Sequence, residues 1–329
     1  MIVLLFLFAG LVSFSLTHWR PVYGLGLVIL FLPWYWIRAP IFGIPMTLLE
    51  WVLLGFVVAV VARHFLNRPV DSRLRGNDEH GSGGILKWLV MLWVLAGTTA
   101  IFVSPDLVGA LGSWRAFIIE PVLFGLAAVT TLKESVDSRL RGNDRREISR
   151  IIITWAFVIL AAYESIIAFL QRIGIWYLPI PWDDPLGPKG IRVTGSFPHP
   201  TMLGLLLAPI VVFLVIIAYQ KCWPRILRWS AGITAGFALV AILLSKTAGA
   251  ILGIGIVAIV FAFLRPKARR WMLPMCAGVV LLTLIVPSAV ARTWNFATVN
   301  GYGAATRRVQ WVEAIELLRD HPLTGAGLR

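Results

Sequence analysis

The stretch RVTGSFPHPTML, residues 192–203, lies where a polar, proline-rich segment turns into a long apolar one. Gly195 and Pro198 are typical of a turn, and the apolar run at 201–219 is long enough for a helix that crosses a membrane. Arg192 comes just before that helix, whose N-terminus carries a partial positive charge. An arginine beside a helix N-terminus suits a phosphate group, although a plain surface arginine fits the same local pattern.

The composition around this stretch is that of a membrane protein. Of the 329 residues, 58% are hydrophobic and only 14% are charged, and the mean hydropathy is +0.82. A soluble domain of this length could not bury so much apolar surface. The net charge of +14 would suggest nucleic-acid binding in a soluble chain. In a membrane protein it marks loops on the cytoplasmic side instead, so no nucleic-acid partner is expected.

Apolar runs of about spanning length predict an all-α, polytopic transmembrane bundle of about ten membrane helices. The first two runs are short, which fits a tight hairpin or a re-entrant segment. The expected helices are at 2–17, 20–37, 46–66, 85–103, 114–132, 150–171, 201–219, 226–245, 248–264 and 270–287.

The basic residues predict the orientation of these helices. Most of the 30 lysines and arginines fall in alternate loops, which we therefore place in the cytoplasm, together with loop insertions near 67–84 and 133–149. Each insertion contains the nonapeptide VDSRLRGND. The outer loop 172–200 then faces the opposite side. Residues 1–290 form the transmembrane domain, and 291–329 begin a large outer loop.

Further candidate site residues lie on the predicted outer side. Lys246 stands in a short turn between two apolar runs, where a lysine either has a task or extends its ammonium group to the membrane surface. His199 is expected to form a hydrogen bond at the helix start. Two acids, Glu120 and Glu164, lie inside apolar runs and should be paired or functional, with Arg115 as the nearest partner of Glu120.

The C-terminal segment predicts a short amphipathic helix over 306–318, capped by Thr306. Arg307, Arg308 and Trp311 lie near its start. The sequence Asp-His-Pro at 320–322 is expected to end the helix, and Gly-Ala-Gly at 325–327 to form a turn. An interfacial helix on the membrane surface is the simpler alternative for this segment.

Four stretches, taken in order, resemble the O-antigen ligase and O-antigen polymerase family of bacterial envelope glycosyltransferases. They are IPMTLLE at 44–50, WRAFIIEPVL at 114–123, RVTGSFPHPTMLG at 192–204 and RRVQWVEAIELLRDHPLTGAG at 307–327.

This resemblance implies the transfer of an undecaprenyl-pyrophosphate-linked glycan to an acceptor on the outer, periplasmic face of the bacterial inner membrane. The acceptor would be lipid A-core, a growing O-antigen chain or a protein, and no cofactor or metal is implied. Arg192 and Arg307 would bind the pyrophosphate and act in catalysis. Substrate contacts would come from these two and from His199, Lys246, Arg308 and Trp311.

The sequence also departs from the family pattern. Lys246 stands where the family often has arginine, and the family usually continues beyond the Gly-x-Gly turn into more outer loop and further helices, so truncation is expected. His321 precedes that turn and is interpreted as structural, with a catalytic role as the alternative. Two other functions stay open: a permease for an anionic solute, and an inactive remnant.

Overall fold

A computed structural model describes residues 2–41, 44–66, 83–137, 144–176, 192–264, 302–322, 325 and 327–328. The chain divides into two compact units, each treated by itself below. One unit comprises Met1–Ile153 with Gln310–Arg329, and the other comprises Thr154–Val309. The repeated nonapeptides lie largely, and the predicted helix at 270–287 entirely, outside the described residues.

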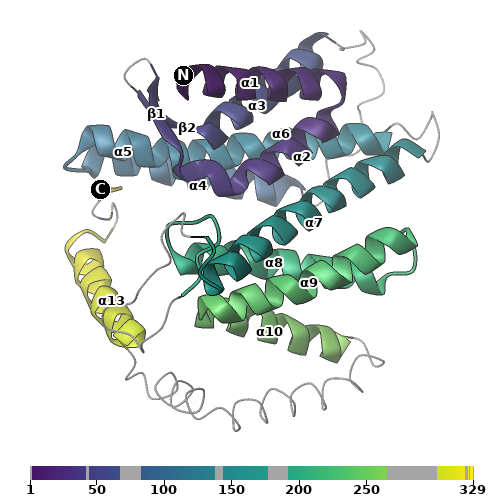
Figure 1. Cartoon of the computed structure of the whole chain (residues 1–329). Coiled ribbons are helices and arrows are strands. Elements are labelled where there is room, and N and C mark those ends of the chain that lie inside the picture. Colours follow the sequence, from purple (N-terminus) through teal and green to yellow (C-terminus); the bar gives the residue numbers. More distant parts are fainter. Residues whose placement is uncertain are drawn as a thin grey trace. The chain divides into compact units, whose positions relative to one another are not determined.

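The first unit begins with a hairpin of two helices that packs on a third (Figure 1). Helix α1 (Ile2–Trp19) and helix α2 (Pro21–Phe31) are separated by a single residue, Arg20. Proline at the first position of α2 suits a helix start, where no backbone donor is lost. Helix α3 (Leu48–Leu66) packs along α1, and the Ser13 hydroxyl donates a 2.7 Å hydrogen bond to the Val52 carbonyl oxygen. Of the two alternatives for the first two runs, a tight hairpin or a re-entrant segment, the contacts between α1 and α2 favour the hairpin.

A small β-hairpin separates α2 from α3. After α2 the chain makes a 3₁₀ turn, η1 (Leu32–Trp36), followed by the antiparallel strands β1 (Arg38–Ile41) and β2 (Ile44–Thr47). The hairpin lies largely between the helices predicted at 20–37 and 46–66, and the start of the second predicted helix is wrong by two residues, since 46 and 47 belong to β2. Prolines at 33, 40 and 45 oppose a continuous helix, because proline lacks a donor and restricts the preceding residue.

One long apolar segment follows in the same unit. Helix α4 (Gly83–Val103) leads through a short turn into α5 (Leu107–Trp114), a π-helical turn η3 (Arg115–Ile119) and α6 (Glu120–Asp137). The helix predicted at 114–132 therefore begins earlier, at Leu107. The Asp106 carboxylate caps it there by accepting a 3.0 Å hydrogen bond from the Gly109 amide.

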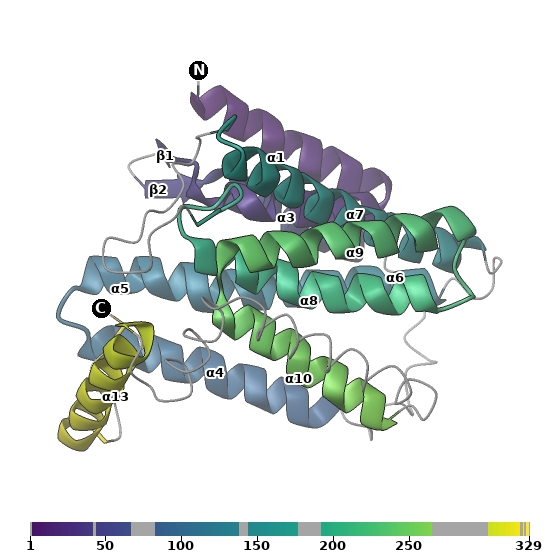
Figure 2. The same ribbon diagram turned by 60° about the horizontal axis from the view of Figure 1, so that its bottom comes forward.

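The second unit is built on helices that follow the Arg192 stretch. Helix α7 (Asp144–Arg172) enters it at Thr154. Helix α8 (Pro200–Tyr219) and helix α9 (Arg225–Ser245) form an antiparallel pair, and α10 (Ala248–Leu264) packs on α8 (Figures 1 and 2). Leu203, Leu207 and Leu214 of α8 are fully buried. Their spacing of four and seven residues places them on one face.

The C-terminal helix α13 (Tyr302–Asp320) is longer than predicted. It begins four residues before Thr306, so Thr306 lies inside the helix and the prediction that it caps the helix is wrong. The helix ends at Asp320, before Pro322, as predicted. Apolar side chains of α13 are exposed, among them Trp311 at 71% and Leu318 at 59%.

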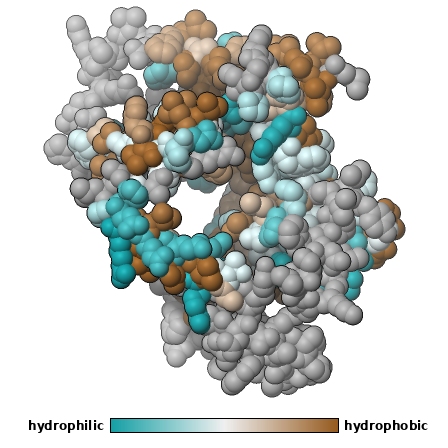
Figure 3. All heavy atoms as spheres, turned by 90° about the vertical axis from the view of Figure 1, so that its left-hand side faces the viewer, coloured by the Kyte–Doolittle hydropathy of each residue, from teal (hydrophilic) through white to brown (hydrophobic). Residues whose placement is uncertain are grey.

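The described helices confirm an all-α, multi-pass membrane protein. Seven of them are long and apolar enough to cross a membrane, and two shorter apolar helices lie at Pro21–Trp36 and Ala248–Phe261. Many large hydrophobic side chains of the described residues are exposed, and Figure 3 shows hydrophobic patches, in brown, beside hydrophilic ones in teal. A water-soluble protein would bury such residues, whereas lipid accommodates them at the surface.

Candidate functional site

The turn between Arg192 and α8 is held by a buried glutamine from α7. The Gln171 side-chain oxygen accepts hydrogen bonds from the backbone amides of Thr194 and Gly195, at 2.9 and 3.0 Å. Its side-chain nitrogen donates to the Thr194 hydroxyl at 3.1 Å and to the Gly195 carbonyl oxygen at 2.7 Å. One side chain thus fixes two successive peptide groups of the turn. These peptide groups need hydrogen-bond partners, because a buried backbone N–H or C=O group without one is energetically costly in a membrane protein.

A buried carboxylate holds the next residue of the turn. Glu164 of α7 is 0% exposed and accepts a 2.9 Å hydrogen bond from the Ser196 amide, and the Ser196 hydroxyl donates to its other oxygen. The expectation that this intramembrane acid is paired is confirmed. Its partner comes from the turn, which the sequence did not reveal. Glu164 therefore acts as a positioning group for the loop that carries Arg192.

Gly195 lets the turn approach this carboxylate. Its φ is +62°, in the left-handed region that favours glycine. A Cβ atom at this position would lie 2.3 Å from a Glu164 carboxylate oxygen and 2.8 Å from a Leu203 methyl carbon. The turn therefore requires glycine both for its backbone conformation and for space.

Arg192 reaches from this turn to the end of α9. Its Nε donates a 2.9 Å hydrogen bond to the Ser245 carbonyl oxygen, and Nη2 lies 3.5 Å from the Lys246 carbonyl oxygen. These carbonyls belong to the C-terminal end of a helix, where partial negative charge accumulates and a cation is favourable. The half-buried guanidinium is thereby fixed. The structure brings together Arg192 and Lys246, which are 54 residues apart in sequence.

Lys246 itself has an uncommon backbone conformation. Its φ of +54° and ψ of +34° are left-handed, and it is the only described residue other than glycine with a positive φ. Helices often end in this conformation, but usually with glycine. The neighbouring hydroxyls fix the turn: Ser245 and Thr247 lie 2.8 Å apart, and Thr247 donates a 3.2 Å hydrogen bond to the Pro200 carbonyl oxygen. Lys246 therefore occupies a position where the backbone of a glycine would be less strained.

His199 lies at the start of α8 and acts as its N-cap. Its Nδ1 accepts a 3.2 Å hydrogen bond from the Thr201 amide. The predicted hydrogen-bonding role is confirmed. Because Nδ1 is the acceptor, the ring proton resides on Nε2 in this arrangement. His199, Arg192 and Lys246 thus all flank the junction between the turn, α8 and α9.

The other predicted site residues lie on or just after α13. Arg307, Arg308 and Trp311 are exposed in the second and third turns of that helix, and His321 directly follows it. Their placement beside Arg192 stays a prediction from the sequence. The His321 carbonyl oxygen accepts a 3.0 Å hydrogen bond from the Gly325 amide, and the role of its side chain stays a prediction.

The Gly-x-Gly turn packs on the first unit. Gly325 and Gly327 both have positive φ, so the predicted turn is confirmed. A Cβ atom at Gly327 would lie 2.6 Å from the Ser104 Cα atom, in the turn between α4 and α5. The turn that follows α13 therefore contacts the α4–α5 turn within the first unit.

A second charged cluster lies in the first unit. Arg115 pairs with Glu120 at 3.3 Å, as predicted, and also with Glu50 at 3.2 Å. Glu50 further accepts a 2.9 Å hydrogen bond from the Thr47 amide, while the Thr47 hydroxyl accepts one from the Glu50 amide at 3.1 Å. This is a capping box at the start of α3. The sequence signal for Glu50 is the pattern Thr-x-x-Glu at residues 47–50, which is typical of a capping box.

Residues 233–329 match the O-antigen ligase family, a segment that includes Lys246, Arg307, Arg308, Trp311 and His321 but not Arg192 or His199. No curated protein and no solved structure matches the chain significantly. The match confirms the resemblance drawn from the sequence and supports glycan ligation as the general activity. The chain is a multi-pass membrane protein whose residues 233–329 are similar to the O-antigen ligase family.

Proposed function

We propose that the protein transfers an undecaprenyl-pyrophosphate-linked glycan to an acceptor on the periplasmic face of the bacterial inner membrane. The acceptor would be lipid A-core, a growing O-antigen chain or a protein. The observation that carries the proposal is the contact between Arg192 and the turn of Lys246. It joins the stretch that resembles the family to the domain that matches it.

The chemistry of the reaction fits a site made of cations. Pyrophosphate is already a good leaving group, so the protein has mainly to bind it and stabilise its developing negative charge. Arginine presents several donors in a planar arrangement that matches phosphate, whereas lysine supplies a compact positive charge. In this proposal Arg192 and Lys246 bind the pyrophosphate, with Arg307 as the second arginine. Arg308 and Trp311 contact donor or glycan.

The left-handed conformation of Lys246 supports a task for its side chain. A residue with a Cβ atom is strained there relative to glycine, by about 1 kcal/mol. Retaining lysine under that strain is expected where the ammonium group is needed. His199 caps the start of α8. Its Nε2 would donate a further hydrogen bond to the substrate.

The test uses three variants of Lys246 and Arg192. Lys246→Gly removes the charge and relieves the backbone strain, so the protein should fold and insert normally. Lys246→Arg keeps a cation, and Arg192→Lys keeps a charge without the planar donor arrangement. The matched control is Arg319→Gln, which removes an exposed cation late in α13.

Transfer is measured with membranes that contain the full chain, a purified lipid-linked oligosaccharide donor and lipid A-core, and product is resolved on gels. Loss of one such electrostatic contact should lower the rate by about 10²-fold or more in Lys246→Gly. Lys246→Arg should retain most of the activity, and the control should match the unmodified protein. Full activity in Lys246→Gly at equal protein level would refute the role of Lys246. Full activity in Arg192→Lys would likewise refute the role of the planar guanidinium.

A further inference from the structure

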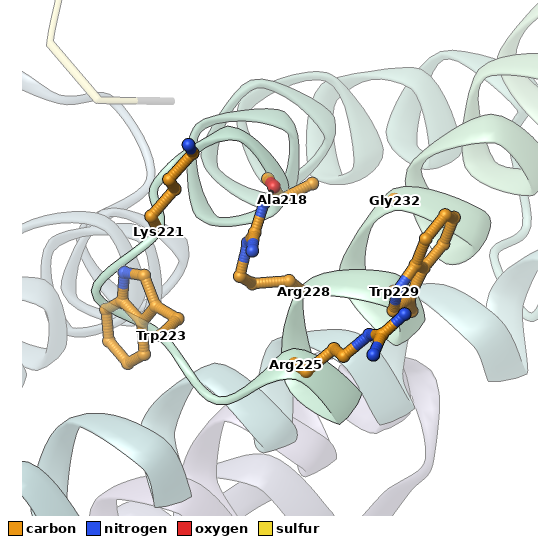
Figure 4. Close-up of a pocket in the computed structure, with 7 residues that line it drawn as sticks. All are labelled: Ala218, Lys221, Trp223, Arg225, Arg228, Trp229 and Gly232. Atoms are coloured by element: carbon orange, nitrogen blue, oxygen red, sulfur yellow. Dashed lines mark hydrogen bonds between the residues drawn. The ribbon is translucent and has the colours of Figure 1, made fainter.

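A basic pocket lies between the end of α8 and the start of α9, at the far end of this helix pair from the Arg192 turn. Its volume is about 480 Å³, and its lining includes Lys221, Arg225 and Arg228 (Figure 4). Helix α8 has 20 residues and so separates the pocket from the Arg192 turn by about 30 Å. The pocket therefore cannot belong to the candidate glycan site.

The turn that carries these cations is held by hydrogen bonds. The Arg228 Nε donates a 3.2 Å hydrogen bond to the Ala218 carbonyl oxygen in the last turn of α8 (Figure 4). The Gln220 side-chain oxygen accepts a 3.0 Å hydrogen bond from the indole N–H of Trp223. Arg228 and Trp223 thus have defined positions in the lining, although the loop that joins the helices is short and largely exposed.

The charge of the pocket is not compensated within the part of the chain that the structure describes. Neither Lys221, Arg225 nor Arg228 forms an ion pair with a described carboxylate. Arg225 is also the first residue of α9, whose N-terminus has no side-chain cap because Pro224 precedes it. The free amides of that first turn add further positive potential. Three cations and a helix terminus together favour a ligand with a phosphate group.

The surroundings of the pocket favour a phosphate that is attached to a lipid. Trp223 and Trp229 belong to the lining, and tryptophan is enriched at membrane interfaces. From Trp229 an exposed apolar stripe continues along one face of α9, formed by Ile233, Phe237 and Val240 at 57%, 53% and 41% exposure. Their spacing of three and four residues keeps them on that face. An acyl chain can lie along this stripe while its headgroup occupies the pocket.

We propose that this pocket binds the headgroup phosphate of an anionic phospholipid, with its acyl chains along the exposed face of α9. Basic pockets between membrane helices are suited to such headgroups. The phosphate of the bound lipid would contact Lys221 of the loop and the arginines of α9 at the same time. It would thereby link the ends of α8 and α9. The proposal is independent of the glycan-transfer reaction, since it concerns the opposite end of the helix pair.

The experiment compares lipid binding to the purified full-length protein with and without two of the cations. The double variant Lys221→Gln, Arg225→Gln removes two charges and leaves the hydrogen bond of Arg228 intact, so that the turn should fold. The matched control is Lys87→Gln, Lys133→Gln, which removes two exposed lysines from α4 and α6. Phosphatidylglycerol, phosphatidylcholine and inorganic phosphate are each titrated in detergent, and bound lipid is counted by native mass spectrometry and by the shift in thermal unfolding.

We expect phosphatidylglycerol to bind the unmodified protein and the control with similar affinity, and the double variant about 30-fold more weakly, given the contribution of each cation near a membrane surface. Phosphatidylcholine and inorganic phosphate should bind weakly to all three. Equal binding of phosphatidylglycerol to the double variant would overturn the proposal. Stabilisation by inorganic phosphate alone that equals the effect of the lipid would overturn the assignment to a lipid headgroup.

Discussion

Replacing Gly195 with alanine should destabilise the second unit, because the turn before α8 has no room for a methyl group. The new Cβ atom would lie 2.3 Å from a Glu164 oxygen and 2.8 Å from a Leu203 carbon. Contacts this short cannot persist, so either the turn or the carboxylate has to move. The hydrogen bonds between Glu164 and Ser196 are the ones first affected.

The magnitude follows from two contributions. A left-handed conformation in a residue with a Cβ atom costs about 1–2 kcal/mol. Leaving part of a buried, hydrogen-bonded carboxylate unsatisfied costs about 1–3 kcal/mol more. The free energy of unfolding should therefore fall by about 2–5 kcal/mol, and the midpoint of thermal unfolding should fall by about 5–15 °C.

The assay is thermal unfolding of the detergent-solubilised protein, followed by tryptophan fluorescence. The matched control is Gly236→Ala in the middle of α9, where a Cβ atom would have no neighbour within 4 Å. Since alanine favours helix more than glycine does, that variant should be as stable as the unmodified protein or slightly more stable. If Gly195→Ala unfolds at the same temperature as Gly236→Ala, the account of the Gly195 turn is wrong.

Substitutions at three further positions test other parts of the structure. Gly204→Ala should lower the unfolding midpoint by several degrees, because its Cβ atom would lie 2.7 Å from a side-chain carbon in the turn before α10; an unchanged midpoint would argue against the close approach of α8 to that turn. Gly327→Ala should release the C-terminal turn from the α4–α5 turn, seen as faster hydrogen exchange there, whereas unaltered exchange would contradict the contact. Glu50→Gln keeps an acceptor for the Thr47 amide but removes the charge opposite Arg115, so it should destabilise by about 1–3 kcal/mol in chemical denaturation, and Glu50→Ala by more. Equal stability of these two Glu50 variants would refute the capping role.

The class of the protein could be predicted from the sequence, because the hydrocarbon core of a membrane requires every backbone polar group to be paired within the protein. Long apolar runs have to form helices in a membrane, so the spans of α4, α8, α9 and α10 were predicted to within two residues. The rule gave no indication of the β-hairpin at residues 38–47, most of which lies between two predicted helices, because so short a proline-containing hairpin has no long apolar run to mark it. The predicted start of α13 was four residues too late, because the apolar spacing that indicated the helix begins only at Val309.

The sequence by itself determined which residues are candidates for the chemistry: Arg192, Lys246 and the arginines of α13 stood out as cations on the predicted outer side. Only the tertiary structure decided that Arg192 contacts the turn of Lys246, and that Glu164 and Gln171 hold the loop that carries it. These contacts join residues 23 to 54 positions apart. No local pattern encodes them, because they depend on how α7, α8 and α9 pack together. An acid within an apolar helix signals that it has a partner, but the fold alone selects which backbone amide that partner is.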